Sequence, residues 1–145
     1  MRWRKAIGVS LVALVVWVAG EGAPLMAEPI GVDNGQVKIT ANRIGKGYGR
    51  LDFFARVRQK WYPLATWQPM VCIVYDGQQG EVNWQPVLAH GRVKGTTMDF
   101  SDQLADPDGG EWRVRVTVAL DPNEPVAKIR CEWRCSSCLL YTSPS

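Results

Sequence analysis

The sequence predicts an all-β fold: an antiparallel β-sandwich, cut short at its C-terminal end and preceded by a signal-peptide helix. Three observations predict it. Apolar and polar residues alternate with a period of two through most of the interior, which is typical of half-buried strands. Turn-forming Gly, Pro, Asn and Asp recur at short intervals. Outside the N-terminal segment, apolar residues do not recur at the spacing of an amphipathic helix.

The first strands expected in the interior are short. Gln36 to Ala41 and Arg50 to Gln59 both alternate, and the glycine-rich stretch from Gly45 to Gly49 supplies turning residues between them. Met70 to Tyr75 is a continuous apolar run, which predicts a central strand covered on both faces. Asp76-Gly77 ends that run with a turn signal.

Two weaker strands follow, at Val82 to Val87 and Gly91 to Phe100, which are interrupted by Pro86 and Gly95. With the clearer segments downstream, the chain offers at least seven short strands separated by turns. This number and spacing favour a sandwich over any helical architecture.

The clearest element is a hairpin near the C-terminal end. Glu111 to Leu120 and Lys128 to Arg134 both alternate strictly, and Asp121 to Pro125 forms the turn because proline fixes φ and lacks a donor. One face is charged and the other is expected to be buried, Trp112 and Trp133 included. The residues expected to face inward are Trp112, Val114, Val116, Val118, Leu120, Ala127, Ile129, Cys131 and Trp133.

The N-terminal segment predicts export. A basic start with Arg2, Arg4 and Lys5 precedes an uncharged apolar run from Ala6 to Gly20. A helix over this run would be about 22 Å long, shorter than the ~30 Å bilayer core, which favours a signal peptide over an uncleaved anchor. We place the signal peptide at residues 1–27, with cleavage after Ala27 or, alternatively, after Gly20. The mature protein is then secreted, periplasmic or on the cell surface, without stable membrane insertion.

The last eight residues resemble the translation of a sequencing adapter. Residues 138–145 read Cys-Leu-Leu-Tyr-Thr-Ser-Pro-Ser and follow a strand pattern that stops abruptly. The alternative is a genuine C-terminal tail. The expected domain is therefore residues 28–137, an incomplete sandwich followed by a non-native tail.

Charge and composition exclude several classes of protein. The chain has 17 Lys and Arg against 14 Asp and Glu, a formal net charge of +3, and 46% hydrophobic residues, as in an ordinary globular chain. Removing residues 1–27 takes away three basic residues and Glu21, which leaves the rest nearly neutral. We therefore expect no nucleic-acid partner.

The cysteines do not predict a cofactor. Cys131, Cys135 and Cys138 have the C-x3-C-x2-C spacing that holds an iron–sulfur cluster in radical-SAM enzymes, but an exported chain meets an oxidising compartment and Cys138 falls in the adapter-like string. A zinc site would have only His90 as a fourth ligand. Cys72 and Cys131 could form a disulfide between strands, or both could be buried free thiols; free thiols are the preferred interpretation.

No catalytic constellation is apparent. His90, the only histidine, lies near a strand end without a nucleophile motif, and a surface histidine is expected. Asp99, Asp102 and the segment Asp106 to Glu111 are acidic, and the segment faintly resembles a calcium loop. We expect a hairpin turn there instead, and no enzyme activity in this chain.

The aromatics supply the remaining functional indication. Trp61, Tyr62 and Trp67 lie around Pro63 and Pro69, in a stretch that is expected to be a loop. Exposed aromatic faces can stack on sugar rings, so these three residues are the candidate ligand-binding site. The alternative is that they cover one end of the sandwich.

The chain also resembles a known class of protein. The strings are Gly49 to Phe53, Trp84 to Val87, Glu111 to Val116 and Lys128 to Trp133. Across most of residues 35–134 the chain resembles the N-terminal β-sandwich of large exported bacterial proteins related to glycoside hydrolases. In that class a barrel after the sandwich carries the catalytic carboxylates, so the resemblance implies a supporting domain and assigns no catalytic residue here.

The function expected from the sequence is therefore an exported, non-catalytic β-sandwich, the N-terminal part of a larger carbohydrate-active protein. Its partners would be carbohydrate or the missing C-terminal domain. The alternative is a self-contained adhesion or protein-binding sandwich of the cell envelope.

Overall fold

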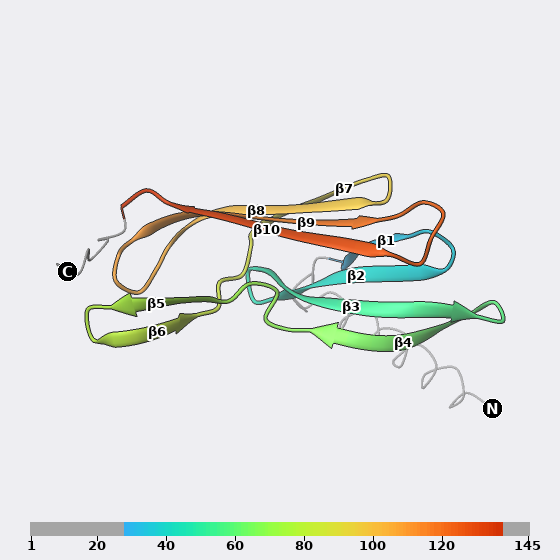
Figure 1. The fold of residues 1–145 in the computed structure, drawn as a ribbon, viewed down its shortest axis with the longest axis horizontal. Coiled ribbons are helices and arrows are strands. Elements are labelled where there is room, and N and C mark those ends of the chain that lie inside the picture. The colour runs from blue at the N-terminus through green and yellow to red at the C-terminus, as the bar shows by residue number, and fades with distance from the viewer. Residues whose placement is uncertain (1–27, 138–145) are drawn as a thin grey trace, which may run out of the picture.

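The computed structural model describes residues 28–137, and in this part of the chain it contains strands and no helix (Figure 1). The predicted all-β class is confirmed. The predicted signal peptide and the adapter-like tail lie outside the described residues. No helix long and apolar enough to cross a membrane occurs within residues 28–137.

The strands are β1 (Ile30–Asp33), β2 (Val37–Ile44), β3 (Gly47–Val57), β4 (Lys60–Trp67), β5 (Ile73–Gly77), β6 (Gly80–Trp84), β7 (His90–Lys94), β8 (Thr97–Ala105), β9 (Glu111–Leu120) and β10 (Ala127–Cys135).

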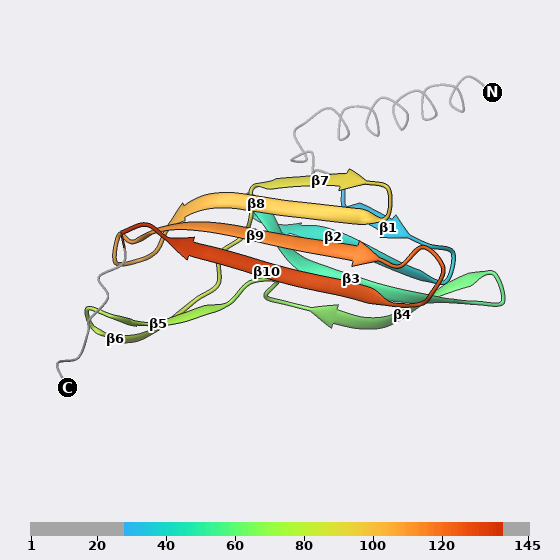
Figure 2. The ribbon, with the colours of Figure 1, turned by 45° about the horizontal axis from the view of Figure 1, so that its top comes forward.

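Two antiparallel sheets face each other as the layers of a sandwich (Figures 1 and 2). The first sheet has the order β1-β2-β3-β4, and the second has the order β10-β9-β8-β7. The separate hairpin β5-β6 joins the two sheets in sequence and lies beyond the first sheet, under one end of the second. Each four-stranded sheet comes from one half of the described chain, so the core is closed by contacts that are remote in sequence.

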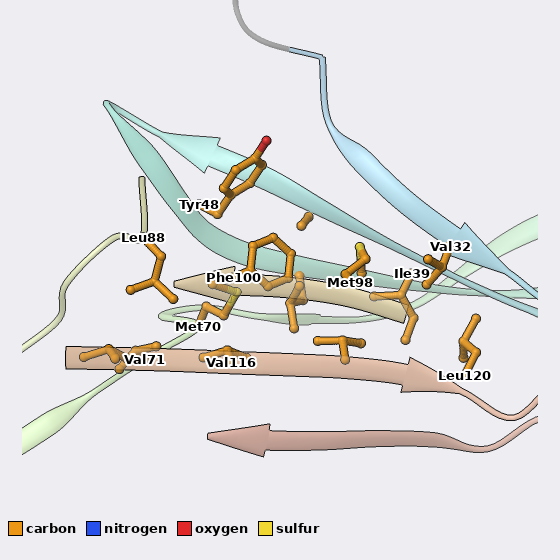
Figure 3. Close-up of a cluster of buried hydrophobic side chains, with 14 of the residues drawn as sticks. Val32, Ile39, Tyr48, Met70, Val71, Leu88, Met98, Phe100, Val116 and Leu120 are labelled. Carbon is orange, nitrogen blue, oxygen red and sulfur yellow. The ribbon is translucent and has the colours of Figure 1, made fainter. Parts of the chain in front are cut away.

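The core lies between the two inner faces (Figure 3). Phe100 and Met98 of β8 and Ile39 of β2 are fully buried, and the rings of Tyr48 and Phe100 are 5.2 Å apart. Side chains of this kind stabilise a fold by about 1.5–3 kcal/mol each when buried. In the strands, the alternation of the sequence places these side chains on the inner face. The largest fully buried side chains are Phe100, Ile39, Leu51, Leu88, Met98, Val114, Val116 and Val118.

The predicted C-terminal hairpin is confirmed. Strand β9 has the predicted bounds, β10 exceeds its prediction by one residue at each end, and the two pair in antiparallel register. The turn is held by the Asp121 carboxylate, which accepts hydrogen bonds from the N–H groups of Asn123 at 2.8 Å and Glu124 at 3.0 Å. An aspartate that caps its own turn is a common local device.

The prediction of a central strand at Met70 to Tyr75 is wrong. Only Ile73 onward is strand, and β5 pairs with β6 alone. One side of β5 packs through Tyr75 against Trp112, with ring centroids 6.2 Å apart, whereas Val74 on the other side is 56% exposed. An apolar run is compatible with burial on both faces but does not require it.

The expected loop around Trp61 is also wrong, because it forms the edge strand β4. The chain enters it through a tight turn in which Arg58 and Gln59 have φ values of 47° and 68°. Pro63 is tolerated because an edge strand can lack a ladder donor, and a bulge shifts the register between Phe53 and Phe54. The candidate strand at 91–100 is instead the hairpin β7-β8, and β1 was not predicted.

Candidate functional site

The strongest candidate site is a cleft between two edge strands. The end of β4, the segment 68–74 and the outermost strand β10 enclose a cavity of about 510 Å³. Three indoles line it, one each from β4, β9 and β10. We call this cavity the aromatic cleft; its lining includes Trp67, Pro69, Met70, Cys72, Trp112 and Trp133.

Trp67 belongs to the first sheet. It pairs with Leu51, which lies in the core, and cross-strand partners project from the same face of a sheet. Trp67 therefore points to the inner side, yet it is 47% exposed because no further strand of the described chain lies beside β4. The chain after it is held against β3 by a hydrogen bond from the Met70 N–H to the Gly49 carbonyl at 2.8 Å.

Trp133 approaches the cleft from the second sheet. It pairs with buried Val114, so its inward direction is as predicted, but it is 59% exposed and the predicted core position is wrong. The physical reason is that β10 is the outermost strand of its sheet. Beneath the neighbouring strand lies the small hairpin, whose Trp84 packs on Trp112 at 6.1 Å between ring centroids.

The three aromatics predicted as one site are divided by the sheet. Tyr62 pairs with Ala55 and shares the inner side with Trp67, whereas Trp61 pairs with Arg56 on the outer side. There the Trp61 ring lies under the Lys38 ammonium, 5.0 Å from its centroid, and contributes to a cation–π contact. One ligand therefore cannot stack on Trp61 and Trp67 together, and the residue that reasoning from sequence missed is Trp133.

The possible disulfide between Cys72 and Cys131 is not formed. Both are free, as preferred, but both are exposed where burial was expected. They line the aromatic cleft, and the Cys72 thiol lies 3.1 Å from the Asn83 side-chain oxygen. Cys135 is the cysteine of the described residues that is disulfide-bonded.

The acidic segment after β8 is the predicted hairpin turn. The Asp106 carboxylate accepts hydrogen bonds from the Trp112 indole at 2.6 Å and from the N–H groups of Gly110 and Asp108 at 2.8 and 2.9 Å. Burial acts to raise the pKa of Asp106, but these donors outweigh it and lower the pKa below its ordinary value. Within residues 28–137, no group of three metal-ligating side chains gathers. His90 is exposed at the start of β7, as predicted for a surface histidine.

No protein-family model, curated protein or solved structure matches this chain. What the cleft can bind is therefore inferred from the side chains that line it. Among the residues that the structure describes, that lining contains no carboxylate, imidazole, ammonium or guanidinium group. Such a surface can bind by stacking and apolar contact, with the side-chain amide of Gln68 and the thiols of Cys72 and Cys131 as its polar side-chain groups.

Proposed function

We propose that this chain is an exported, non-catalytic β-sandwich that binds carbohydrate through the aromatic cleft, as the N-terminal part of a larger carbohydrate-active protein. The observation that carries the proposal is the pair of half-exposed indoles, Trp67 and Trp133, which border one cavity from opposite sheets. Sugar rings present apolar C–H faces that pack on indoles, while their hydroxyls remain available to solvent and amide groups.

The composition of the cleft favours binding over hydrolysis. Glycoside hydrolysis requires two carboxyl groups on either side of the scissile bond. No carboxylate of residues 28–137 lines the cleft, and the buried Asp106 accepts hydrogen bonds from Trp112 and backbone donors. The basic start and apolar run of residues 1–20 support export.

Titration of the chain with neutral oligosaccharides, followed by tryptophan fluorescence, tests the proposal. We expect Trp67→Ala and Trp133→Ala each to weaken binding about tenfold, since the loss of one stacked aromatic contact costs up to ~1.5 kcal/mol. Trp61→Ala is the matched control, because it removes an indole of β4 from the outer face and should leave the affinity unchanged.

The proposal is overturned if no neutral oligosaccharide binds at millimolar concentration, or if Trp61→Ala weakens binding as much as Trp67→Ala does. Hydrolysis of aryl glycosides that disappears on substitution of one acidic residue would overturn the non-catalytic assignment.

A second candidate function is protein binding by strand addition. It is favoured by the edge of β10, a nine-residue strand that, within residues 28–137, pairs only with β9. An extended peptide could continue the sheet there through main-chain hydrogen bonds. Sequencing the locus beyond codon 137 separates the candidates: a downstream barrel with paired acids supports the first, and a stop codon or tandem sandwiches support the second.

A further inference from the structure

The outer face of the second sheet collects half of the basic side chains of the described chain. Pairing of β7, β8, β9 and β10 aligns their outward positions, which form the face turned toward the viewer in Figure 2. We call this surface the basic face. Its seven cations are Arg92, Lys94, Arg113, Arg115, Lys128, Arg130 and Arg134, against three carboxylates, Asp99, Glu111 and Glu132.

The register places two of these cations side by side. Arg113 and Arg134 are direct cross-strand partners, and Gln103 of β8 continues their row. Like charges in this position repel and destabilise the pair unless an anion lies between them. A hollow of about 810 Å³ opens over this part of the face. Its lining includes the cations Arg113, Arg115 and Arg134, the polar side chains His90, Ser101 and Gln103, the carboxylates Asp102 and Glu132, and Cys131 and Trp133, which also line the aromatic cleft.

Two of the three carboxylates of the face are paired with other cations, and Glu111 forms no ion pair within residues 28–137. Asp99 accepts from Arg115 at 3.0 Å and lies 3.8 Å from Arg92, and Glu132 pairs with Arg130 at 2.8 Å. Within residues 28–137 no carboxylate pairs with Arg113 or Arg134. Two exposed guanidinium groups in one row are therefore available for planar, bidentate contact with an external anion.

We propose that the basic face binds an anionic polysaccharide, one that bears carboxylate or sulfate groups, with Arg113 and Arg134 as its principal contacts. The hydroxyl of Ser101 and the amide of Gln103 line the same hollow and can bond sugar hydroxyls. The outward positions of the four strands contain no Phe, Tyr or Trp, the residues on which unpaired bases stack, and no large apolar side chain that could enter a lipid surface. Trp133, which also lines the hollow, belongs to the inner side of β10. The hollow shares Cys131 and Trp133 with the aromatic cleft, but the charges that carry this proposal lie on the outer side of the sheet, and the proposal does not depend on the function of the cleft.

The test measures binding of the full chain to polygalacturonate and dextran sulfate, with neutral dextran, double-stranded DNA and vesicles containing anionic lipid as comparison ligands. The test variant is Arg113→Gln with Arg134→Gln. The control variant is Lys46→Gln with Lys60→Gln, which removes the same charge from exposed positions outside the face.

We expect the test variant to bind the acidic polysaccharides at least tenfold more weakly and with a shallower dependence of log K on log salt concentration, and the control to stay within twofold of the parent. Preference for polygalacturonate or for dextran sulfate identifies carboxylate or sulfate as the recognised group. Trp67→Ala should leave this binding unchanged, so failure of the cleft proposal is distinguishable from failure here. Equal losses in the two double variants, tighter binding to DNA or vesicles than to either polysaccharide, or no binding in low salt would overturn the proposal.

Discussion

Asp106 is a buried carboxylate whose role is defined by its donors. Its two oxygens accept from the Trp112 indole and from backbone N–H groups of the turn between β8 and β9. This arrangement couples the turn to Trp112, on which the small hairpin packs through Tyr75 and Trp84. One side chain thus links a local turn to the contact between two separate sheets.

The acid sensitivity of the fold should depend on Asp106. Because folding lowers its pKa, the charged form contributes stability that is present above the ordinary carboxyl value of 3.8 and is lost as the pH falls through the lower, folded value. Asp106→Asn should cost about 1 to 3 kcal/mol near neutral pH, by disturbing buried hydrogen bonds, and should flatten the loss of stability below pH 3.8. Urea unfolding as a function of pH measures both the free energy of unfolding near neutral pH and its decrease in acid.

The matched control for this variant is Asp76→Asn, an exposed carboxylate of β5. It should leave the pH dependence of unfolding unchanged. An Asp106→Asn variant as stable as the parent at neutral pH and equally sensitive to acid would contradict the assigned role.

At the scale of elements, burial depends on the position of a strand in its sheet. In the described part of the chain, strand β9 is paired on both sides and β10 on one side only, although both alternate equally well in sequence. The inner side of β9 is buried throughout, whereas that of β10 is half-buried at Ile129 and exposed at Trp133. Alternation therefore determines direction, and the order of strands determines exposure.

The hairpin β5-β6 should open before the rest of the fold. A two-stranded sheet is only marginally stable by itself, and within residues 28–137 neither strand of this hairpin pairs with a strand of the two large sheets. We expect its amide hydrogens to exchange at least tenfold faster than those of β8 and β9, whose strands are paired on both sides and carry the core. Hydrogen exchange followed by mass spectrometry measures this difference, and equal protection of the hairpin and β9 would show that they unfold as one unit.

At the scale of the molecule, the two sheets leave one edge of the sandwich open. Apolar side chains of the edge strands β4 and β10 are exposed there, among them Tyr62, Leu64, Trp67 and Trp133. Clustered exposed apolar side chains of this kind mark a binding surface or an aggregation risk. On the opposite side of the second sheet the exposed surface is basic, so the molecule has two chemically distinct faces within one small fold.

This open edge should make residues 28–137, expressed alone, bind a hydrophobic dye or aggregate. Trp133→Thr should lower the fluorescence of bound 8-anilinonaphthalene-1-sulfonate by about half while leaving the thermal midpoint nearly unchanged, since the side chain is already exposed. Trp61→Thr, on the outer face, is the control. A sharply melting monomer that binds no dye would contradict the prediction.

The sequence by itself determined the fold class, most of the strands and the direction of their side chains. Glu111 to Leu120 is the clearest case. Alternation over ten residues between two turn signals indicates a strand with one buried face and does not fit an amphipathic helix. The turns at Asp121 and Asp106 were predictable for the same reason, since their chemistry is local.

Only the tertiary structure decided which strands lie at the edges and which residues meet. Trp67 and Trp133 are far apart in sequence, and Arg113 faces Arg134 only because β9 and β10 pair in one register. Alternation of apolar and polar residues indicates on which face of its strand a side chain lies. It does not indicate the order of the strands in a sheet or which sheet packs against which. Exposure and proximity are properties of that assembly, which is why both proposed sites became visible only in the folded molecule.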